Sequence, residues 1–237
     1  MHMLNKSLEL VPLFAGIPSA ELSPISDRAR RRTYPAKTQI VWRGDPGETL
    51  FVIQSGKVKV HSATENGSEI TLAVRGPGSC FGELSLIDQS PRSADITTLE
   101  PTECLIVDGA TLQDAIERSP KLAWHMMQHL AKLVREANDA VETLASRDVA
   151  GRVALLLLRL TENHGVPATG TTKGGPAKGI RIPMTLTKTD IKSFVGATRE
   201  HVTNIMTEFT KAGLITTDSA TGHLVVIDHD GLSKRIQ

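Results

Sequence analysis

Short β-branched runs separated by glycine turns fill residues 37–107, and this pattern restricts that stretch to a β architecture. The predicted strands are 39–42, 50–53, 58–61, 70–74, 96–98 and 103–107. Between the third and fourth, Asn66-Gly67 predicts a type I′ hairpin turn. Many short strands with frequent turns are typical of a jelly-roll-like sandwich or barrel, here called the β-roll.

The apolar period changes to that of a helix after Pro120. The predicted seam has spacings of 4, 3, 4, 3 and 4, and consists of Met126, Leu130, Leu133, Ala137, Ala140 and Leu144. Such a heptad pattern predicts one long helix that pairs with a second copy as a coiled coil. The alternative is a single helix that packs against its own β-roll.

Bulk properties narrow the class of protein. A length of 237 residues suits two domains. From Val149 onward there are 11 Lys+Arg and 7 Asp+Glu, a charge of +4, while the remainder has 16 and 19, or −3. This weak asymmetry favours a nucleic-acid partner for the second part. No apolar run reaches the length of a membrane span, and Met1–Val11 lacks a signal-peptide layout, so we expect a cytoplasmic protein with no membrane partner.

Two sequence segments follow the long helix. Ser146-Arg147-Asp148 predicts a hinge, and an amphipathic helix is expected over 149–163. Residues 165–179 are rich in Gly, Pro, Thr and Lys without periodicity, which predicts a flexible loop. The expected fold class is α+β.

A group of residues within the β-stretch suits an anionic ligand that also carries a sugar hydroxyl. Gly82 allows close approach of the backbone, and Glu83 can accept a hydrogen bond from a ribose hydroxyl. Arg92 offers a planar, permanently charged fork for a phosphate, and Ser93 can hold the same oxygens.

A helix-turn-helix is predicted near the C-terminus. Thr187 and Thr198 are the expected N-caps of helices over 188–195 and up to about Ala212, with Gly196 at the turn between them. The expected buried face consists of Ile191, Val195, Val202, Ile205, Met206 and Phe209. Runs at 214–217 and 223–227 predict a β-hairpin wing.

The outer side of the second helix carries the candidate DNA contacts. Arg199 can pair with guanine, and Glu200 can accept from cytosine. Lys188 and Thr189 are expected to touch phosphates. The full predicted set is Lys188, Thr189, Thr198, Arg199, Glu200, His201 and Asn204. The alternative is an ordinary packed helix pair with charged residues facing solvent.

With both motifs placed, nearly the whole chain resembles the cyclic-AMP receptor protein/FNR family of bacterial transcription regulators. The resemblance implies a β-roll domain over residues 1–118, a dimerisation helix and hinge over 119–147, and a winged helix-turn-helix over 148–237. It also implies a homodimer that binds a cyclic nucleotide and a palindromic double-stranded operator, with RNA polymerase as a further partner.

The same resemblance assigns the effector pocket. It implies that Gly82, Glu83 and Ser85 face the ribose and phosphate, and that Arg92 and Ser93 hold the cyclic phosphate. The implied pocket walls are Val60, Leu72, Ala73 and Leu84. Members that respond to cyclic AMP carry Thr and then Ser or Asn on the long helix to read adenine, where this chain has Ala137 and Asn138.

Departures at four positions leave the ligand and the operator open. Beyond Ala137, Leu133 stands where such members often carry an Arg, so the effector could be cyclic AMP, cyclic GMP or another nucleotide, or the pocket could be vestigial. In the second helix of the helix-turn-helix, family members commonly have a Thr and a basic residue where this chain has His201 and Asn204. Asn204 could pair with adenine.

Metal, thiol and enzyme chemistry have weaker support in the sequence. His125 and His129 have metal-ligand spacing, but no third ligand is evident in the sequence, so we expect no metal. Cys80 and Cys104 form no CxxC pattern, and Cys80 is interpreted as a buried apolar residue, with a thiol sensor as the alternative. No nucleophile–base pair or Walker loop is found, so an enzyme is not expected. A nucleotide-sensing module that acts on a partner protein is the remaining alternative function.

Overall fold

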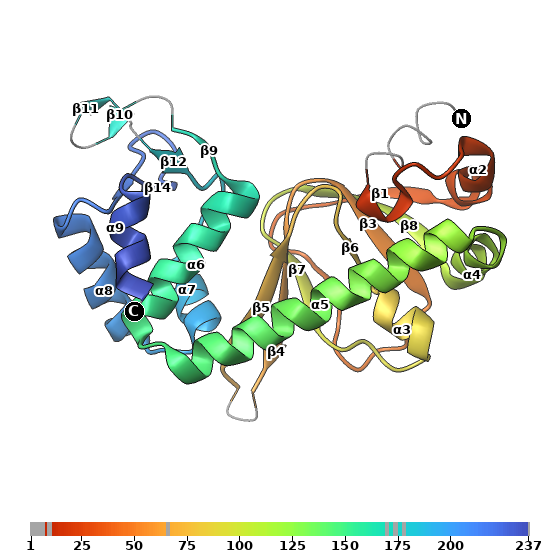
Figure 1. The fold of residues 1–237 in the computed structure, drawn as a ribbon, viewed down its shortest axis with the longest axis horizontal. Helices are drawn as coiled ribbons and strands as arrows, with labels where there is room; N and C mark the ends of the chain where they lie inside the picture. The colour runs from red at the N-terminus through yellow and green to blue at the C-terminus, as the bar shows by residue number, and fades with distance from the viewer. Residues whose placement is uncertain are drawn as a thin grey trace. The chain divides into compact units, whose positions relative to one another are not determined.

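The computed structural model of the chain describes Leu8 and residues 11–64, 67–168, 171–172, 175–176 and 179–236. It divides into two compact units, the first made of residues up to 63 and 72–137, the second of residues 64–71 and 138–237 (Figure 1). Asn66 of the predicted hairpin turn and most of Met1–Val11 lie outside the described residues.

The first unit is a β-roll with short helices, and every predicted strand is present. One sheet has the order β1-β8-β3-β6 and the other β2-β7-β4-β5. The strands are β1 (Arg30–Tyr34), β2 (Gln39–Val41), β3 (Thr49–Ser55), β4 (Val58–Ala63), β5 (Glu69–Arg75), β6 (Cys80–Phe81), β7 (Asp95–Thr98) and β8 (Thr102–Asp108). The helices are η1 (Pro12–Phe14), α2 (Ser19–Arg28), α3 (Glu83–Asp88) and α4 (Gly109–Arg118). Sequence reasoning missed β1, β6 and these four helices.

Strand β3 shows how the roll is built, because its side chains alternate between two cores. Leu50 and Val52 join an apolar cluster with residues of η1, α2 and α4. Phe51 and Ile53 point to the opposite side, into a second cluster that includes Ile96 of the other sheet. A strand that is buried on both faces therefore separates a helix-covered core from the interior of the roll.

The long helix α5 (Pro120–Ser146) forms as predicted, but the predicted phase of its seam is wrong in part. Met126 is buried in the first unit, and Leu133 lines a cavity there. The large apolar side chains that α5 exposes are Trp124, Met127, Val134, Val141 and Leu144. The misassignment has a simple cause: Met127, Val134 and Val141 each directly follow a residue of the predicted seam, so two apolar stripes overlap.

The second unit contains the predicted helix-turn-helix. After the break at Arg147-Asp148 come α6 (Val149–His164), α7 (Lys188–Val195) and α8 (Arg199–Lys211). The predicted buried face of α7 and α8 is buried at every position. A short helix α9 (His229–Ser233) and the 3-10 turn η2 (Lys234–Ile236) end the described chain. Within the described residues, no helix combines the length and apolarity needed to cross a bilayer.

The wing is larger than the predicted hairpin. The strands β13 (Ile215–Thr217) and β14 (Leu224–Val226) pair as expected, but β12 (Ile180–Arg181) and β9 (Val166–Pro167) extend the sheet to the order β13-β14-β12-β9. A second small pair is formed by β10 (Thr171–Thr172) and β11 (Gly175–Pro176). The prediction of an unstructured loop over 165–179 is therefore wrong in part, because two-residue strands are too short to show an alternating pattern.

Candidate functional site

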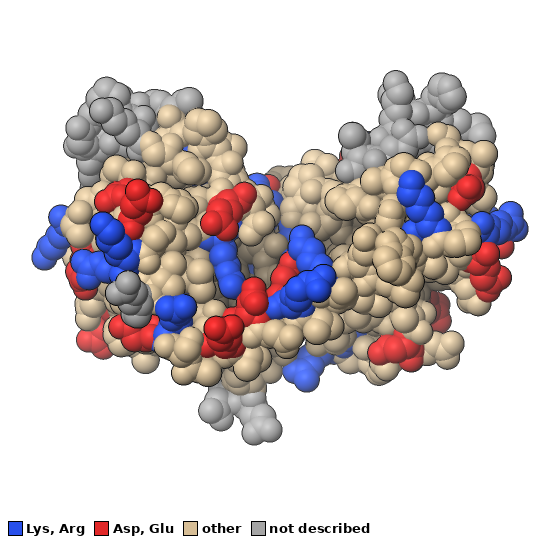
Figure 2. Space-filling model, viewed as in Figure 1, with Lys and Arg blue, Asp and Glu red and all other residues tan. Residues whose placement is uncertain are grey.

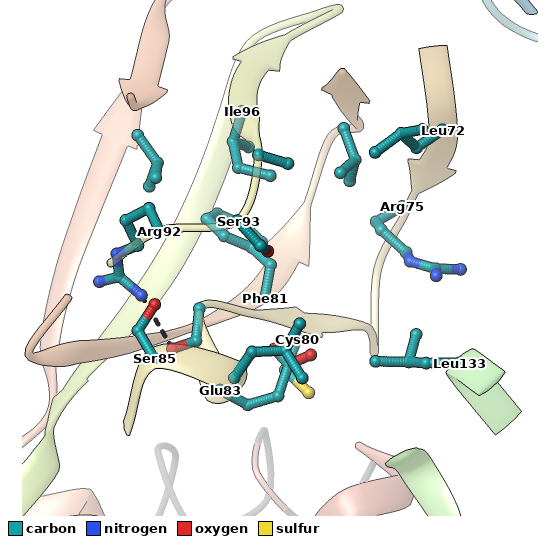
Figure 3. Close-up of a pocket in the computed structure, with 15 residues that line it drawn as sticks. Leu72, Arg75, Cys80, Phe81, Glu83, Ser85, Arg92, Ser93, Ile96 and Leu133 are labelled. Carbon is teal, nitrogen blue, oxygen red and sulfur yellow. Dashed lines mark hydrogen bonds between the residues drawn. The ribbon is translucent and has the colours of Figure 1, made fainter. Parts of the chain in front are cut away.

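A cavity of about 220 Å³ opens in the first unit where the β6–α3 corner meets the two sheets and α5 (Figure 3). Its walls combine apolar side chains with a small number of polar and charged groups, as ligand pockets do. The lining residues are Val41, Val60, Leu72, Arg75, Cys80, Phe81, Gly82, Glu83, Leu84, Ser85, Arg92, Ser93, Ala94, Ile96 and Leu133.

Arg92 brings a buried cation to this cavity, since its residue is only 7% exposed. Its Nη1 donates to the carbonyl of Gly82 at 2.8 Å, and its Nη2 donates to the carbonyl and hydroxyl of Thr49 at 2.9 and 3.1 Å. Burial lowers the pKa of the guanidinium, and the Glu83 charge acts in the opposite direction. Among the described residues, no carboxylate oxygen lies within 4 Å of it. The cation is thus oriented by neutral acceptors, with Nε–H and one Nη1–H left over from its five donors.

Two glycines allow the backbone to pack against Arg92. Gly82 has a φ of 87°, and a Cβ there would lie 2.5 Å from Nη1 of Arg92. At Gly47 a Cβ would lie 2.4 Å from the Cβ of Ser85 and 2.8 Å from Nε of Arg92. Side chains at either position would displace the guanidinium or Ser85, so both glycines help to define the site.

Glu83 begins α3 and is buried with an unsatisfied oxygen. Its Oε1 lies 3.4 Å from Nε2 of His129 on α5, while Oε2 has no hydrogen-bond partner among the described residues. The same Nε2 lies 3.7 Å from Sγ of Cys80. A buried acceptor without a donor costs about 1–3 kcal/mol, so this corner favours a ligand that supplies a donor or a cation.

The thiol of Cys80 is not a reactive nucleophile in this setting. Burial, followed by the Glu83 charge, raises its pKa well above the ordinary value for a thiol. A thiol sensor needs thiolate, which such an environment suppresses. Nearby, Arg75 of β5 forms a 2.6 Å ion pair with Glu136 and so joins the pocket wall to α5.

The helix-turn-helix is positioned by local sequence signals. Thr187 and Asp190 form a capping box at the start of α7, and Gly196 ends that helix with a φ of 62°. The Thr198 side chain accepts a hydrogen bond from the backbone N–H of His201 and caps α8. These caps satisfy donors that each helix start would otherwise leave unpaired.

The predicted DNA-contacting residues share one property: all seven are exposed. Within the described part of the chain, no hydrogen bond or ion pair is recorded for the side chains of Arg199, Glu200 or Asn204. Figure 2 shows basic and acidic side chains interspersed over the visible face of the second unit. No single basic patch stands out on that face, so a partner would be selected by the pattern of individual side chains.

Known proteins resemble the chain over nearly its full length. It is 32% identical over 204 residues to a protein of Thermus thermophilus described as "Cyclic AMP receptor protein", covering 86% of this chain and 88% of that one. Family models match residues 31–119 as a "Cyclic nucleotide-binding domain" and residues 151–235 as a "Crp-like helix-turn-helix domain". The chain belongs to the cyclic-AMP receptor protein/FNR family of transcription regulators.

One further relative and one solved structure are similar to the chain over most of its length. A "CRP-like cAMP-activated global transcriptional regulator" of Mycobacterium tuberculosis is 29% identical over 232 residues, covering 98% of this chain and 99% of that protein. A solved structure of the c-di-GMP-responsive regulator CLP from Xanthomonas campestris has a TM-score of 0.71 at 22% identity, covering 89% and 99% of the two chains. This structural likeness concerns the fold alone.

As a family member, the chain has most of its predicted effector residues around one cavity. Val60, Leu72, Gly82, Glu83, Leu84, Ser85, Arg92 and Ser93 all line it. Ala73, Ala137 and Asn138 are not in the lining, and the last two are exposed on α5.

Sequence reasoning missed several lining residues and one neighbour of the cavity. These are Val41, Arg75, Cys80, Phe81, Ala94, Ile96, Leu133 and His129. A helical signal existed for His129, because it lies one turn before Leu133 on the same predicted helix.

Proposed function

We propose that this transcription regulator is a homodimer whose binding to a palindromic operator is controlled by a cyclic nucleotide, with cyclic AMP as the first candidate. In this proposal the effector binds in the first unit, and its cyclic phosphate pairs with Arg92. The alternative effector is cyclic GMP, since Ala137 cannot read an adenine amino group and Asn138 can both donate and accept. RNA polymerase is the proposed further partner. The proposed location of the protein is the cytoplasm.

The observation that carries this proposal is the buried guanidinium of Arg92. It lines a cavity and is held by three hydrogen bonds to neutral acceptors, with no carboxylate within 4 Å in the described chain. A desolvated cation without a carboxylate partner is expected to bind a ligand phosphate strongly. The orphan Oε2 of Glu83 supports a ligand hydroxyl in the same cavity.

Exposed apolar residues on α5 support the dimer. Met127, Val134 and Val141 repeat every seven residues, which is the spacing of one coiled-coil position. Each is more than half exposed in the single chain. A second copy of α5 is the natural partner for this seam, and Ala137 and Asn138 would then lie beside it. Val134→Glu is expected to shift the sedimentation of the chain from dimer to monomer.

Exposed side chains at the start of α8 support sequence-specific binding to DNA. In a helix-turn-helix, this part of the recognition helix reaches base edges in the major groove. Arg199 and Glu200 suit a G·C step, while Lys188 and Thr189 suit phosphates. Two such helices in a dimer must lie about 34 Å apart to meet successive grooves. A nucleotide that favours this spacing would raise operator affinity, provided it binds that state more tightly.

The test combines calorimetry with operator selection. The purified chain is titrated with cyclic AMP and, separately, with cyclic GMP. A random duplex pool is then selected with and without the nucleotide that binds. We expect micromolar binding of one nucleotide, a palindromic selected site, and tighter operator binding when the nucleotide is present.

Other outcomes separate the parts of the proposal. Equal operator affinity with and without saturating nucleotide would remove the effector control but keep the regulator. Nucleotide binding without any selected sequence would favour a module that acts on a partner protein. Specific binding is also expected to weaken steeply with salt, because phosphate contacts release counterions.

A further inference from the structure

Three side chains of metal-ligating type converge beside the cavity. Cys80 comes from β6, Glu83 from the first turn of α3, and His129 from the middle of α5. One ligand atom from each lies within 4.8 Å of the other two. Figure 3 shows Cys80 and Glu83 together at the lower end of the pocket, below Phe81. Sequence spacing did not reveal this group, because His129 lies 46 residues after Glu83.

The two distances from Nε2 of His129 match those expected between ligands of a tetrahedral ion. Zinc binds thiolate sulfur at about 2.3 Å, imidazole nitrogen at about 2.0–2.1 Å and carboxylate oxygen at about 2.0–2.2 Å. At a tetrahedral angle these lengths place nitrogen about 3.4 Å from oxygen and about 3.6 Å from sulfur. The structure has 3.4 Å from Nε2 of His129 to Oε1 of Glu83, and 3.7 Å to Sγ of Cys80. The nitrogen–oxygen distance exceeds the usual length of about 2.7–3.2 Å for an N–H···O bond, whereas the nitrogen–sulfur distance is also within reach of a hydrogen bond to sulfur.

We propose that Cys80, Glu83 and His129 form a binding site for a divalent transition-metal ion of zinc type. Thiolate, imidazole and carboxylate are the ligands that zinc takes in proteins, and three protein ligands leave a fourth position open. The proposal does not depend on nucleotide binding or on the DNA-binding unit. It replaces the expectation that His129 lacks further ligands.

The unsatisfied oxygen of Glu83, which a nucleotide hydroxyl would otherwise fill, also supports an ion at this corner. The Oε2 of Glu83 is buried without a hydrogen-bond partner, although the Glu83 side chain is only 6% exposed. A cation would satisfy this carboxylate, whose Oε1 lies 3.4 Å from the imidazole of His129. An entry path exists as well, since Cys80 and Glu83 both line the open cavity.

Metal binding would replace the S–H bond of Cys80 by a metal–sulfur bond. Burial disfavours the thiolate of Cys80 in the metal-free protein, but an ion that binds the sulfur drives its deprotonation. The thiol loses its proton to solvent, the sulfur binds the ion, and Glu83 and the imidazole of His129 supply the other two bonds. The ion would then join α5 to the β6–α3 corner of the roll. Such a link holds the helix that carries the proposed dimer seam against the domain that carries the proposed effector pocket.

Cobalt and zinc titrations of the full chain test this site. The reduced protein is freed of metal with a chelator and titrated with Co²⁺ without nucleotide. We expect one ion per chain and a near-ultraviolet thiolate-to-cobalt absorption band. The band should disappear in Cys80→Ala and persist in the matched control Cys104→Ala, whose sulfur lies within the core between the sheets.

Zinc affinity, measured against a competing chelator, gives a second readout. It should fall by about 10-fold or more in His129→Gln and stay unchanged in His125→Gln, because His125 contacts the carbonyl of Leu13 instead. His129 is partly exposed, so its variant should keep the fold even where Cys80→Ala does not. Arg92→Ala should lose nucleotide binding and retain zinc. An absent cobalt band in the wild type, or zinc binding unchanged in His129→Gln, would overturn the proposal.

Discussion

The two proposed recognition regions differ in how their key side chains are held. In the first unit, Arg92 and Glu83 are buried, and Arg92 already uses three hydrogen bonds to the protein. In the second unit, Arg199 and Glu200 are exposed at the start of α8. A buried recognition residue also contributes to the stability of the fold, whereas an exposed one interacts mainly with the binding partner. Substitutions should therefore couple function to stability in the first region and separate them in the second.

The largest expected effect is that of Arg92→Ala. Nucleotide affinity should fall by about 100-fold or more, since each hydrogen bond to a charged group is worth about 1.5–3 kcal/mol. The variant should also unfold more easily, because the carbonyls of Gly82 and Thr49 lose their donor. Calorimetry and thermal unfolding measure the two effects. The control Arg31→Ala removes an exposed ion pair with Glu103 on the same roll and should change neither.

Gly82→Ala should lower nucleotide affinity and stability together without removing a charge. Its φ of 87° is unfavourable for alanine, and the new Cβ would come within 2.7 Å of the carbonyl of Thr49 and closer still to Arg92. We expect a loss of about 1–3 kcal/mol in the free energy of unfolding, together with weaker nucleotide binding. Gly44→Ala serves as a control with similar backbone strain, since its Cβ would meet open space. Equal loss of nucleotide affinity in both variants would mean that strain alone, and not the displaced Arg92, explains the result.

Arg199→Ala should show the opposite behaviour in the second unit. Operator affinity should fall by about 1–3 kcal/mol at the guanine that Arg199 reads, with little change in the unfolding temperature. Binding titrations on operators that differ at single base pairs, together with thermal unfolding, measure both quantities. The same loss on every sequence would make Arg199 a phosphate contact, and a large fall in stability would contradict the contrast between the two regions.

The smallest expected effect is a change in stability at acid pH. Hydrogen bonds from the backbone and hydroxyl of Thr111 lower the pKa of Asp108, the N-cap of α4. Because the folded pKa lies below the unfolded value of about 3.9, Asp108 stabilises the protein above that pH. This stabilisation is lost as the pH falls through the folded pKa. Asp108→Asn should flatten the acid side of the stability curve, with a cost at neutral pH below about 1 kcal/mol. Denaturant unfolding at several pH values measures how stability changes with pH in both proteins. The same pH dependence in Asp108→Asn and the wild type would contradict this reasoning.

Much of the architecture was predictable because it follows from local signals. The caps Thr187 and Thr198 and the turn at Gly196 define the helix-turn-helix, and the structure has these elements where the sequence places them. The β-branched runs of the roll were equally clear. The strands β9 and β12 were not, since each has two residues and exists only through pairing with a distant strand. The cavity was predictable around Glu83 and Arg92 and at the wall residues Val60 and Leu72, but not where Val41 of β2, Arg75 of β5 and Leu133 of α5 complete the walls.

The sequence by itself determined the family, the order of the elements and the residues that carry charge in each proposed site. These properties reside in local patterns of a few residues, which do not depend on how distant parts meet. Only the tertiary structure decided which of two overlapping apolar stripes on α5 packs on the roll and which remains exposed. It also decided that His129 meets Cys80 and Glu83, because contacts between a helix and a strand corner depend on packing and not on spacing along the chain.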